Sequence, residues 1–482
     1  MRPYIYYDPS ITYPAIQEHF SPSQHYPEYP WHDISSKENK IYDTLRNILY
    51  EYGLDKENFG RSTWNPFKNF ISPGMTVLIK PNMVMHQFDN HVSYDELITH
   101  PSIVRAIIDY IYIALNGTGK IIIADAPMQS CNFELLKRNS GYKDIETYFT
   151  NKNINIQLLD LRRIYSKFNE FNELQTFNAS SDPLGYQKID LGKFSFHATL
   201  DRDSSRFRVT NYPPSMMGTY HTKNIHSYLI SNSILSADAV ISIPKLKTHR
   251  KAGMTGAIKN CVGIVGDKAC LPHHSFGSIE EGGDEYLYKN LFKKINTFLN
   301  EASDILNYKK CYSIVKLLRK FQNLNIKFIN KYKRDNYFEG SWYGNDTISR
   351  TSLDLLHILL FSSKDGTIQK YQQRNVLFIV DGIVAGEGEG PLLPTARKAG
   401  IIAISDNAIV LDCILATLMG FDPDKIPTIA NGLKYINMTK SSIFFKTNYI
   451  LWKNKNIQSF EFKDTLQFKS SQGWKEKIYI EH

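Results

Sequence analysis

Short apolar runs alternate with helical patterns along the first third of the chain. Val77–Ile79, Ile121–Ala124 and Ile154–Leu161 are rich in branched apolar residues, as buried strands are. Apolar residues recur at helical spacing over Ser102–Leu115, and Phe133–Arg138 predicts a second, shorter helix. This β-α-β-α-β order predicts a mostly parallel sheet with right-handed crossovers.

Strand-like runs return later in the chain, at Ala239–Ile243, Val376–Val380 and Ile401–Ile404. Asp406–Gly420 follows the last of them with an apolar face at helical spacing. We therefore predict an α/β fold: a mostly parallel sheet with flanking helices, a helical insertion and a short β-rich tail.

Changes in this pattern divide the chain into five segments. They are an N-terminal extension packed on the core (1–72), a first part of the α/β core (73–270), a mainly helical insertion (271–375), a second part of the core (376–430) and a C-terminal tail (431–482). Within the insertion, long amphipathic patterns predict helices at Tyr286–Leu306, Cys311–Lys333 and Thr347–Phe361.

Four of the apolar runs end abruptly in polar residues: VLIK-PN, IIIAD-AP, VISIP-KLKTH and LFIVDG-IVAGEGEGP. In an open parallel sheet, ligands bind in the crevice beyond the carboxyl ends of the strands. If these strands are neighbours, one edge collects the polar residues Lys80, Asn82, Asp125, Lys245, Lys247, His249, Asp381, Glu387 and Glu389. Solvated strand ends would also be polar, but the convergence of four such ends favours a shared site.

The stretch ADAVISIPKLKTHRKAGMTGAIKNCVGIVG, from Ala237 to Gly266, carries the strongest of these signals. Its strand is stopped by Pro244, and a cationic loop follows. Thr255 is expected to cap the N-terminus of a helix that carries Lys259 one turn later. A strand, a cationic loop and a helix N-terminus in this order predict an anion site. A basic surface loop is the alternative.

These positions suggest roles for individual side chains. The candidates for anion binding are Lys80, Asn82, Lys245, Thr255 and Asn260. The candidates for catalysis are His249, Lys247, Lys259 and Asp381. Histidine titrates near neutrality and can act as general acid or base, although a surface or core histidine is an equally common role.

Carboxylates and histidines elsewhere could hold a divalent cation. The candidate ligands are Asp125, His273, His274, Glu387 and Glu389. The alternatives are a solvated acidic loop for the two glutamates and a lid loop for the histidine segment. No Walker A loop, GxSxG elbow or HExxH motif occurs, and GEGEG does not open a helix, so a dinucleotide fingerprint is rejected.

Composition narrows the class of protein. The 482 residues are 42% hydrophobic, which is enough for a large core. The net charge of +9 is spread along the chain, so nucleic acid is not expected as a partner.

Five cysteines without CxxC spacing favour a reducing compartment. Residues 1–20 lack a signal-peptide pattern, and no apolar stretch reaches the ~20 residues of a membrane span. We expect a cytoplasmic protein with no membrane span.

Several motifs in order resemble the domain of unknown function 362 family. They are VLIKPN, THPSIVRAIIDY, IADAP, ISIPKLKTH, MTGAIKN, VDGIVAGEGEGP and SDNAIVLDCILATLMGFDP, from about Thr76 to Pro427. The family's motif positions correspond here to Lys80, Asn82, Asp125, Lys245, Lys247, His249, Thr255, Lys259, Asn260, Asp381, Glu387 and Pro391. LPHHSFG…GGDEY and GSWYGNDTISRTSLDL are similar to a subset of the family associated with bacterial surface-polysaccharide gene clusters.

The resemblance leaves three hypotheses for function. We favour an enzyme acting on an anionic small molecule, such as a sugar or nucleotide-sugar, with or without a divalent cation. Some family members carry a ferredoxin-like module, which suggests an electron-transfer protein, but the cysteine spacing here predicts no iron–sulfur cluster. A non-catalytic anion-binding module is the third. The sequence does not specify the oligomeric state.

Overall fold

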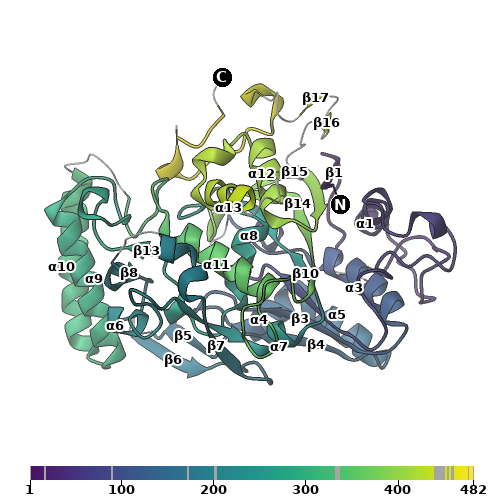
Figure 1. The fold of residues 1–482 in the computed structure, drawn as a ribbon, viewed down its shortest axis with the longest axis horizontal. Helices are drawn as coiled ribbons and strands as arrows, with labels where there is room; N and C mark the ends of the chain where they lie inside the picture. Colours follow the sequence, from purple (N-terminus) through teal and green to yellow (C-terminus); the bar gives the residue numbers. More distant parts are fainter. Residues whose placement is uncertain are drawn as a thin grey trace.

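The computed structural model centres on one large mixed sheet flanked by helices (Figure 1). It describes residues 2–15, 18–87, 91–170, 173–199, 203–331, 337–438, 451–452, 455–456, 461–475 and 477–480. The predicted α/β fold with a mostly parallel sheet is confirmed.

Five parallel strands form the centre of the sheet. In spatial order they are β4 (Ile156–Asp160), β3 (Lys120–Asp125), β2 (Thr76–Pro81), β10 (Ala239–Ile243) and β14 (Asn375–Glu389). All five were expected from the apolar runs. Because they are parallel, their carboxyl ends meet at one edge of the sheet.

Two antiparallel strands complete the other side of the sheet. β14 turns into β15 (Leu393–Ser405), and β1 (Tyr4–Tyr7) pairs with the second half of β15. The N-terminal extension is thus joined to the sheet by backbone hydrogen bonds as well as by side-chain packing.

The two faces of the sheet carry separate apolar cores. Along β2, Val77 and Ile79 enter one core and Leu78 the other, as strand alternation requires. The first core holds α1 (Lys40–Glu51), α3 (Pro101–Leu115), α4 (Phe133–Ser140) and α5 (Tyr142–Asn151). The second holds α7 (Asn232–Ser236), α8 (Ala257–Asn260), α11 (Thr347–Phe361), α12 (Ala408–Met419) and α13 (Pro427–Met438).

The sequence prediction was wrong about the residues after Pro244 and after Asp381. Lys245–His249 is a strand, β11, and it pairs with β12 (Gly253–Thr255) and with the second half of β14. The stretch expected as a Gly/Glu loop therefore continues β14 to Glu389. Glycine permits this pairing, since a Cβ on Gly386 would lie 2.9 Å from the Cβ of Lys247.

The insertion contains a helical hairpin and α11. The hairpin consists of α9 (Leu291–Tyr308) and α10 (Tyr312–Lys331) and lies at the left edge of the molecule in Figure 1. Smaller, two-stranded sheets lie apart from the central sheet. They pair β5 (Ile164–Phe168) with β6 (Leu174–Asn178), β7 (Tyr186–Asp190) with β9 (Ser227–Ser231), and β8 (Phe207–Arg208) with β13 (His274–Ser275). Two short helices lie outside the insertion: α2 (Tyr94–Leu97) follows β2, and α6 (Pro214–Met217) follows β8.

In the tail, β16 (Leu451–Trp452) and β17 (Lys455–Asn456) pair with each other. Residues 439–450, where further edge strands were expected, lie outside the described residues. The five-segment division of the chain remains a prediction.

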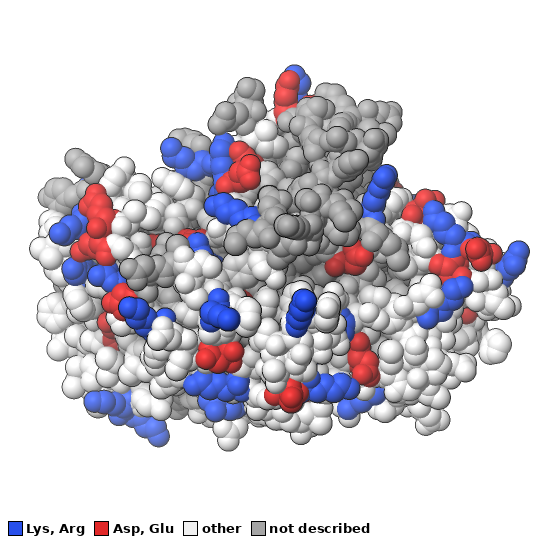
Figure 2. All heavy atoms as spheres, viewed as in Figure 1, with Lys and Arg blue, Asp and Glu red and all other residues white. Residues whose placement is uncertain are grey.

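The surface mixes charges, and the described helices include none that could cross a bilayer. On the face in Figure 2, Lys and Arg side chains are interspersed with Asp and Glu. Within the described ranges, every helix is too short or too polar to span a membrane.

Candidate functional site

A cavity of about 1120 Å³ opens beyond the carboxyl ends of the central strands. Asn82 follows β2, Asp125 ends β3 and His249 ends β11, so three strand ends contribute to its lining. This is where ligands bind in open parallel sheets.

The cavity brings together nine of the fifteen residues expected at the site. Its lining includes the predicted residues Asn82, Asp125, Lys247, His249, Thr255, Lys259, Asn260, His273 and Pro391. The remaining candidates lie outside the lining: Lys80, Lys245, His274, Asp381, Glu387 and Glu389.

Lys80 and Asp125 form a buried ion pair at the base of the cavity, with 2.7 Å between Nζ and Oδ1. Lys80 Nζ also donates to Asn260 Oδ1 at 3.2 Å, and the Met83 amide donates to Asp125 Oδ2 at 2.7 Å. Gly263 makes room for the pair, because a Cβ there would lie 1.9 Å from Asp125 Oδ1. The Lys80 charge is therefore balanced within the protein.

Three other lysines on the lining lack an ion pair as short as that of Lys80. Lys251 is buried 3.8 Å from Glu339, and Lys259 and Lys268 are half-buried. Burial, followed by neighbouring cations, lowers the pKa of Lys259 to about 7. Burial lowers the pKa of Lys251 and of Lys268 to about 8, and the nearest carboxylates only partly oppose it. Within the described part of the chain, Lys259 makes neither a hydrogen bond nor an ion pair. Its charge state is therefore free to respond to a ligand.

Lys268 Nζ donates to the Ala126 carbonyl at 2.8 Å, and the ammonium of Lys247 likewise has a backbone partner. Lys247 Nζ donates to the Leu97 carbonyl at 2.5 Å, and burial lowers its pKa well below the usual value. Lys247 lines the cavity from β11. A ligand there would meet a lysine that is already oriented by α2.

The two cavity histidines are neutral and present opposite ring atoms. His249 Nδ1 accepts from the amides of Lys251 and Ala252 at 3.1 and 3.2 Å, so its proton lies on Nε2. His273 Nδ1 donates to the Leu271 carbonyl at 2.8 Å, which leaves Nε2 as an acceptor. Burial and nearby cations lower the pKa of both well below 6.5. His249 thus offers a donor, and His273 an acceptor.

The prediction that Thr255 caps the next helix was wrong. Thr255 ends β12, the cap position is Gly256, and α8 is only four residues long. The amides of Ala257 and Ile258 donate to Asp412 at 2.6 and 2.9 Å, so this helix end already holds a carboxylate. Thr255 Oγ1 is instead buried at the cavity with no hydrogen-bond partner among the described residues, as is Asn82 Oδ1.

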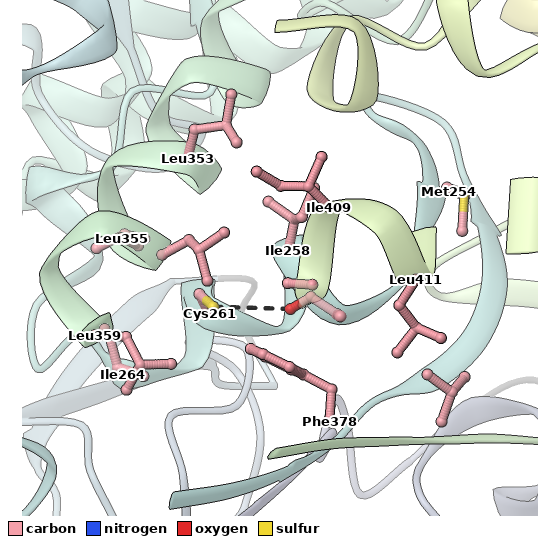
Figure 3. Packing of buried hydrophobic residues seen from close by; sticks show 14 of the residues in the cluster. Met254, Ile258, Cys261, Ile264, Leu353, Leu355, Leu359, Phe378, Ile409 and Leu411 are labelled. Atoms are coloured by element: carbon pink, nitrogen blue, oxygen red, sulfur yellow. Dashed lines mark hydrogen bonds between the residues drawn. The ribbon is translucent and has the colours of Figure 1, made fainter. Parts of the chain in front are cut away.

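Apolar packing behind α8 fixes the position of Lys259. Figure 3 shows Ile258 and Cys261 between α11 and α12, where they meet side chains such as Leu355 and Ile409. Because Ile258 enters this core, the next residue in the chain, Lys259, is directed to the other side, toward the cavity. The packing therefore determines which charge faces the ligand space.

A second group of lining residues is largely apolar. It comes from residues after β2 and β3, from the β5–β6 hairpin and from the segment before α6. Its apolar members include Met83, Met85, Met128, Ile164, Phe168, Phe177, Tyr212 and Met216. The cavity therefore combines cationic and apolar lining residues.

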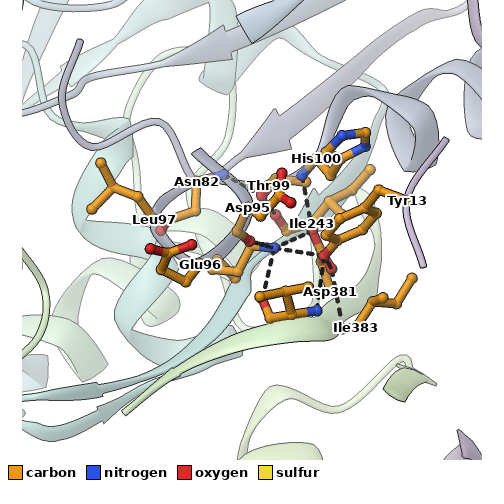
Figure 4. Close-up of polar contacts among 12 residues, drawn as sticks. Tyr13, Asn82, Asp95, Glu96, Leu97, Thr99, His100, Ile243, Asp381 and Ile383 are labelled. Atoms are coloured by element: carbon orange, nitrogen blue, oxygen red, sulfur yellow. Dashed lines mark hydrogen bonds and ion pairs between the residues drawn. The ribbon is translucent and has the colours of Figure 1, made fainter. Parts of the chain in front are cut away.

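Lys245 and Asp381 form a second buried ion pair away from the cavity, 2.6 Å from Nζ to Oδ2. Tyr13 donates to Asp381 Oδ1, and the His100 amide donates to Oδ2 at 2.8 Å. Lys245 also donates to the Asp95 carbonyl at 2.7 Å. Figure 4 shows that this network joins the N-terminal extension, α2 and β14.

The expected metal ligands are dispersed. Glu387 and Glu389 accept from the backbone amides of Lys469 and Gln472, at 3.0 and 2.6 Å, and so attach the tail to β14. His274 is buried in β13. Across the described ranges, no group of three or more His, Cys, Asp or Glu side chains is arranged to hold a metal ion.

Sequence reasoning missed Lys251, Lys268 and Asp412. Lys251 lies two residues after His249, so the KLKTHRK motif itself could have indicated it. Lys268 and Asp412 carry no local signal, because only the fold brings them to α8 and the cavity. Part of the apolar lining, from Ile164 to Met216, comes from residues 162–225, where the sequence shows no clear helix or strand pattern, so it could not be predicted.

Fold and cavity together define an α/β protein with a ligand-sized, lysine-lined site beyond its parallel strands. The chain belongs to the family described as domain of unknown function (DUF362), whose model matches residues 77–199 and 202–417. The resemblance seen in the sequence motifs is thus confirmed.

Two further comparisons add detail. A thylakoid-associated protein of Synechocystis sp. is 21% identical over 414 residues, which cover 85% of this chain and 84% of that protein. A crystal structure of a Thermotoga maritima protein aligns over 74% of this chain with a TM-score of 0.28 and 10% identity. This chain spans about half (53%) of that protein's length.

Proposed function

We propose that the protein is an enzyme that binds an anionic small molecule in the cavity and transfers a proton on it. The observation that carries this proposal is Lys259, a half-buried lysine on the lining with a pKa of about 7 and no partner in the described chain. Groups whose pKa lies near the working pH are the best general acids and bases.

Anion binding follows from the charges of the cationic lining residues. Lys251, Lys259 and Lys268 repel one another when protonated, and an anion between them would relieve this repulsion and raise their pKa values. The Nε2 proton of His249 would add a neutral donor, and Thr255 Oγ1 and Asn82 Oδ1 still lack partners among the described residues. The site therefore gains both charge balance and hydrogen bonds from a ligand.

Proton transfer is assigned to Lys259 as general base in its neutral form. The Nε2 acceptor of His273 is a second candidate on the same cavity. Asp381, expected from the sequence to be catalytic, is given a folding role instead, because its carboxylate is bound by Lys245, Tyr13 and the His100 amide.

Size favours a ligand larger than phosphate. Ligand pockets typically measure about 300–1,000 Å³, and this cavity holds about 1120 Å³. A sugar phosphate or nucleotide-sugar in the cytoplasm would match both the volume and the cationic lining residues. A divalent cation could accompany such a ligand, and the carboxylates on the lining are Asp125 and Asp304.

The test compares Lys259→Met with Lys293→Met. Lys293 is a buried lysine whose pKa is also lowered, to about 8, but its Nζ donates to the Tyr337 carbonyl and lies outside the cavity lining. Pyrophosphate, sugar phosphates and nucleotide-sugars would be screened by thermal shift, and hits measured by calorimetry and by product formation.

We expect Lys259→Met to weaken binding about tenfold or more and to abolish turnover, with Lys293→Met close to wild type. The proposal would be contradicted if Lys259→Met and Lys293→Met bound and turned over a ligand of the wild-type protein equally well. Binding that needs Lys259 but yields no product would instead support the non-catalytic module.

A further inference from the structure

The α9–α10 hairpin exposes a row of large apolar side chains on each helix. On α9 they are Leu291, Phe292, Ile295, Phe298, Ile305 and Tyr308, and on α10 they are Ile314, Leu317, Phe321, Leu324 and Phe328. The spacing of three and four residues on α10 places its row on a single stripe. The rings of Phe292 and Phe328, with centroids 4.6 Å apart, join the two rows into one surface.

The orientation of α9 is the reverse of an ordinary surface helix. Its buried residues are all polar: Lys293, Asn296, Thr297, Ser303 and Asn307. A helix that packs on a protein core turns its apolar face inward. Here polar side chains face the body of the protein and apolar ones face outward. The hairpin therefore presents its apolar surface to the solvent.

The hairpin also carries most of the net charge of the protein. Residues 291–331 contain nine Lys and Arg but only two Asp and Glu, a net charge of +7. The whole chain has a net charge of +9. On α10, Lys316, Lys320 and Lys327 lie on the face next to the apolar stripe. Apolar stripes bordered by lysines characterise helices that lie in a bilayer interface.

We propose that the α9–α10 hairpin docks the protein on the surface of an anionic lipid bilayer. The apolar stripes would enter the headgroup–acyl boundary, and the lysines would contact anionic headgroups. A second copy of the chain is disfavoured as the occupant, because it would bring two surfaces of net charge +7 together. The charged residues keep both helices in the plane of the interface, since neither is apolar enough to span it.

Docking would bring the turn of the hairpin, which lines the cavity, close to the membrane. Tyr308, Lys310 and Tyr312, at the turn of the hairpin, line the cavity that carries Lys259. The apolar lining residues of that cavity would then suit the apolar part of an amphiphilic anion taken from the lipid surface. The docking itself rests on the hairpin alone and does not depend on the proposed chemistry.

Vesicle flotation of the full chain tests the proposal. The vesicles would contain either phosphatidylcholine alone or phosphatidylcholine mixed with phosphatidylglycerol. The variant Leu317→Asp/Phe321→Asp removes apolar side chains that are 54% and 53% exposed. The matched control is Leu184→Asp/Phe194→Asp, whose side chains are 54% and 55% exposed elsewhere on the surface.

We expect the wild type and the control to float with the mixed vesicles, and the hairpin variant to partition about tenfold less or weaker still. Leu324→Trp keeps the test valid if the double variant misfolds, because its fluorescence should shift to the blue on adding mixed vesicles. Absence of flotation by the wild type, equal loss in the control, or an unshifted Leu324→Trp signal would overturn the proposal. A wild-type dimer that Leu317→Asp/Phe321→Asp dissociates would assign this surface to a second copy.

Discussion

At the scale of single residues, the lysines of this protein differ by the partners of their ammonium groups. Lys80 and Lys245 are buried beside a carboxylate, and each forms a short ion pair. Lys259 is half-buried near other cations, and its pKa falls to about 7. Removing a charge from water without a partner costs free energy, which a lysine lowers by losing its proton. Only a lysine without a carboxylate partner, such as Lys259, can therefore use its charge to bind a ligand.

Gly263 tests how closely the cavity base is packed. Gly263→Ala would place a methyl group 1.9 Å from Asp125 Oδ1 and 2.6 Å from Lys80 Nζ. We expect the free energy of unfolding in urea to fall by about 2 kcal/mol, together with weaker ligand binding. The control is Gly218→Ala, where the new methyl group meets only the Ser215 carbonyl at 3.5 Å. An unchanged stability for Gly263→Ala would contradict this packing.

At the scale of elements, β14 serves two sites at different points along its length. Its first half pairs with β10 in the core, and its second half pairs with β11 and carries the tail through Glu387 and Glu389. Asp381 lies where the partner changes from β10 to β11. Its ion pair with Lys245 holds the N-terminal extension and α2 against this junction.

Asp381→Asn should therefore destabilise the fold without abolishing ligand binding in the cavity. The change leaves Lys245 buried and unpaired, which typically costs about 3–5 kcal/mol of unfolding free energy. Ligand affinity of the folded protein should stay within about threefold of wild type. Urea denaturation and calorimetry measure the two effects separately.

The double variant Lys245→Met/Asp381→Leu provides the matched comparison. Because it removes both charges, it should recover much of the lost stability. A folded, fully stable Asp381→Asn protein that binds ligand normally but turns over nothing would return Asp381 to the catalytic role expected from the sequence.

At the scale of the whole molecule, the sequence predicted the sheet and one end of it as the site. Ala239–Ile243 and Thr347–Phe361 match the predicted bounds because each is a continuous pattern with a clear stop. The partners of the site lysines could not be predicted, since Lys80 meets Asp125 and Lys245 meets Asp381 only in the folded sheet. The length of β14 could not be predicted either. Glycines usually favour loops, but here they are required for strand pairing.

The three cavity lysines predict a pH dependence for anion binding. The anion needs protonated lysines, and their pKa values in the free protein are about 7 for Lys259 and about 8 for Lys251 and Lys268. Affinity should therefore be highest below pH 7 and fall as pH rises from about 7 to about 9. A general base must be neutral, so kcat/KM should instead rise through about pH 7, the pKa of Lys259 in the free protein, and then fall with the affinity, which gives a bell-shaped profile. Because bound anion raises that pKa, kcat should rise at a higher pH than kcat/KM. Calorimetry and rate measurements across this range check both trends.

The most direct test of the anion site is the titration of Lys259 itself, followed by NMR of ¹³C-labelled lysine side chains, with Lys259→Met identifying the signal. The site described here predicts a midpoint near pH 7 in the free protein, because burial and neighbouring cations disfavour the charge. Saturating anion should move that midpoint upward by about one unit or more. A midpoint near 10.5 that no anion changes would contradict a cavity built to bind and act on an anionic ligand.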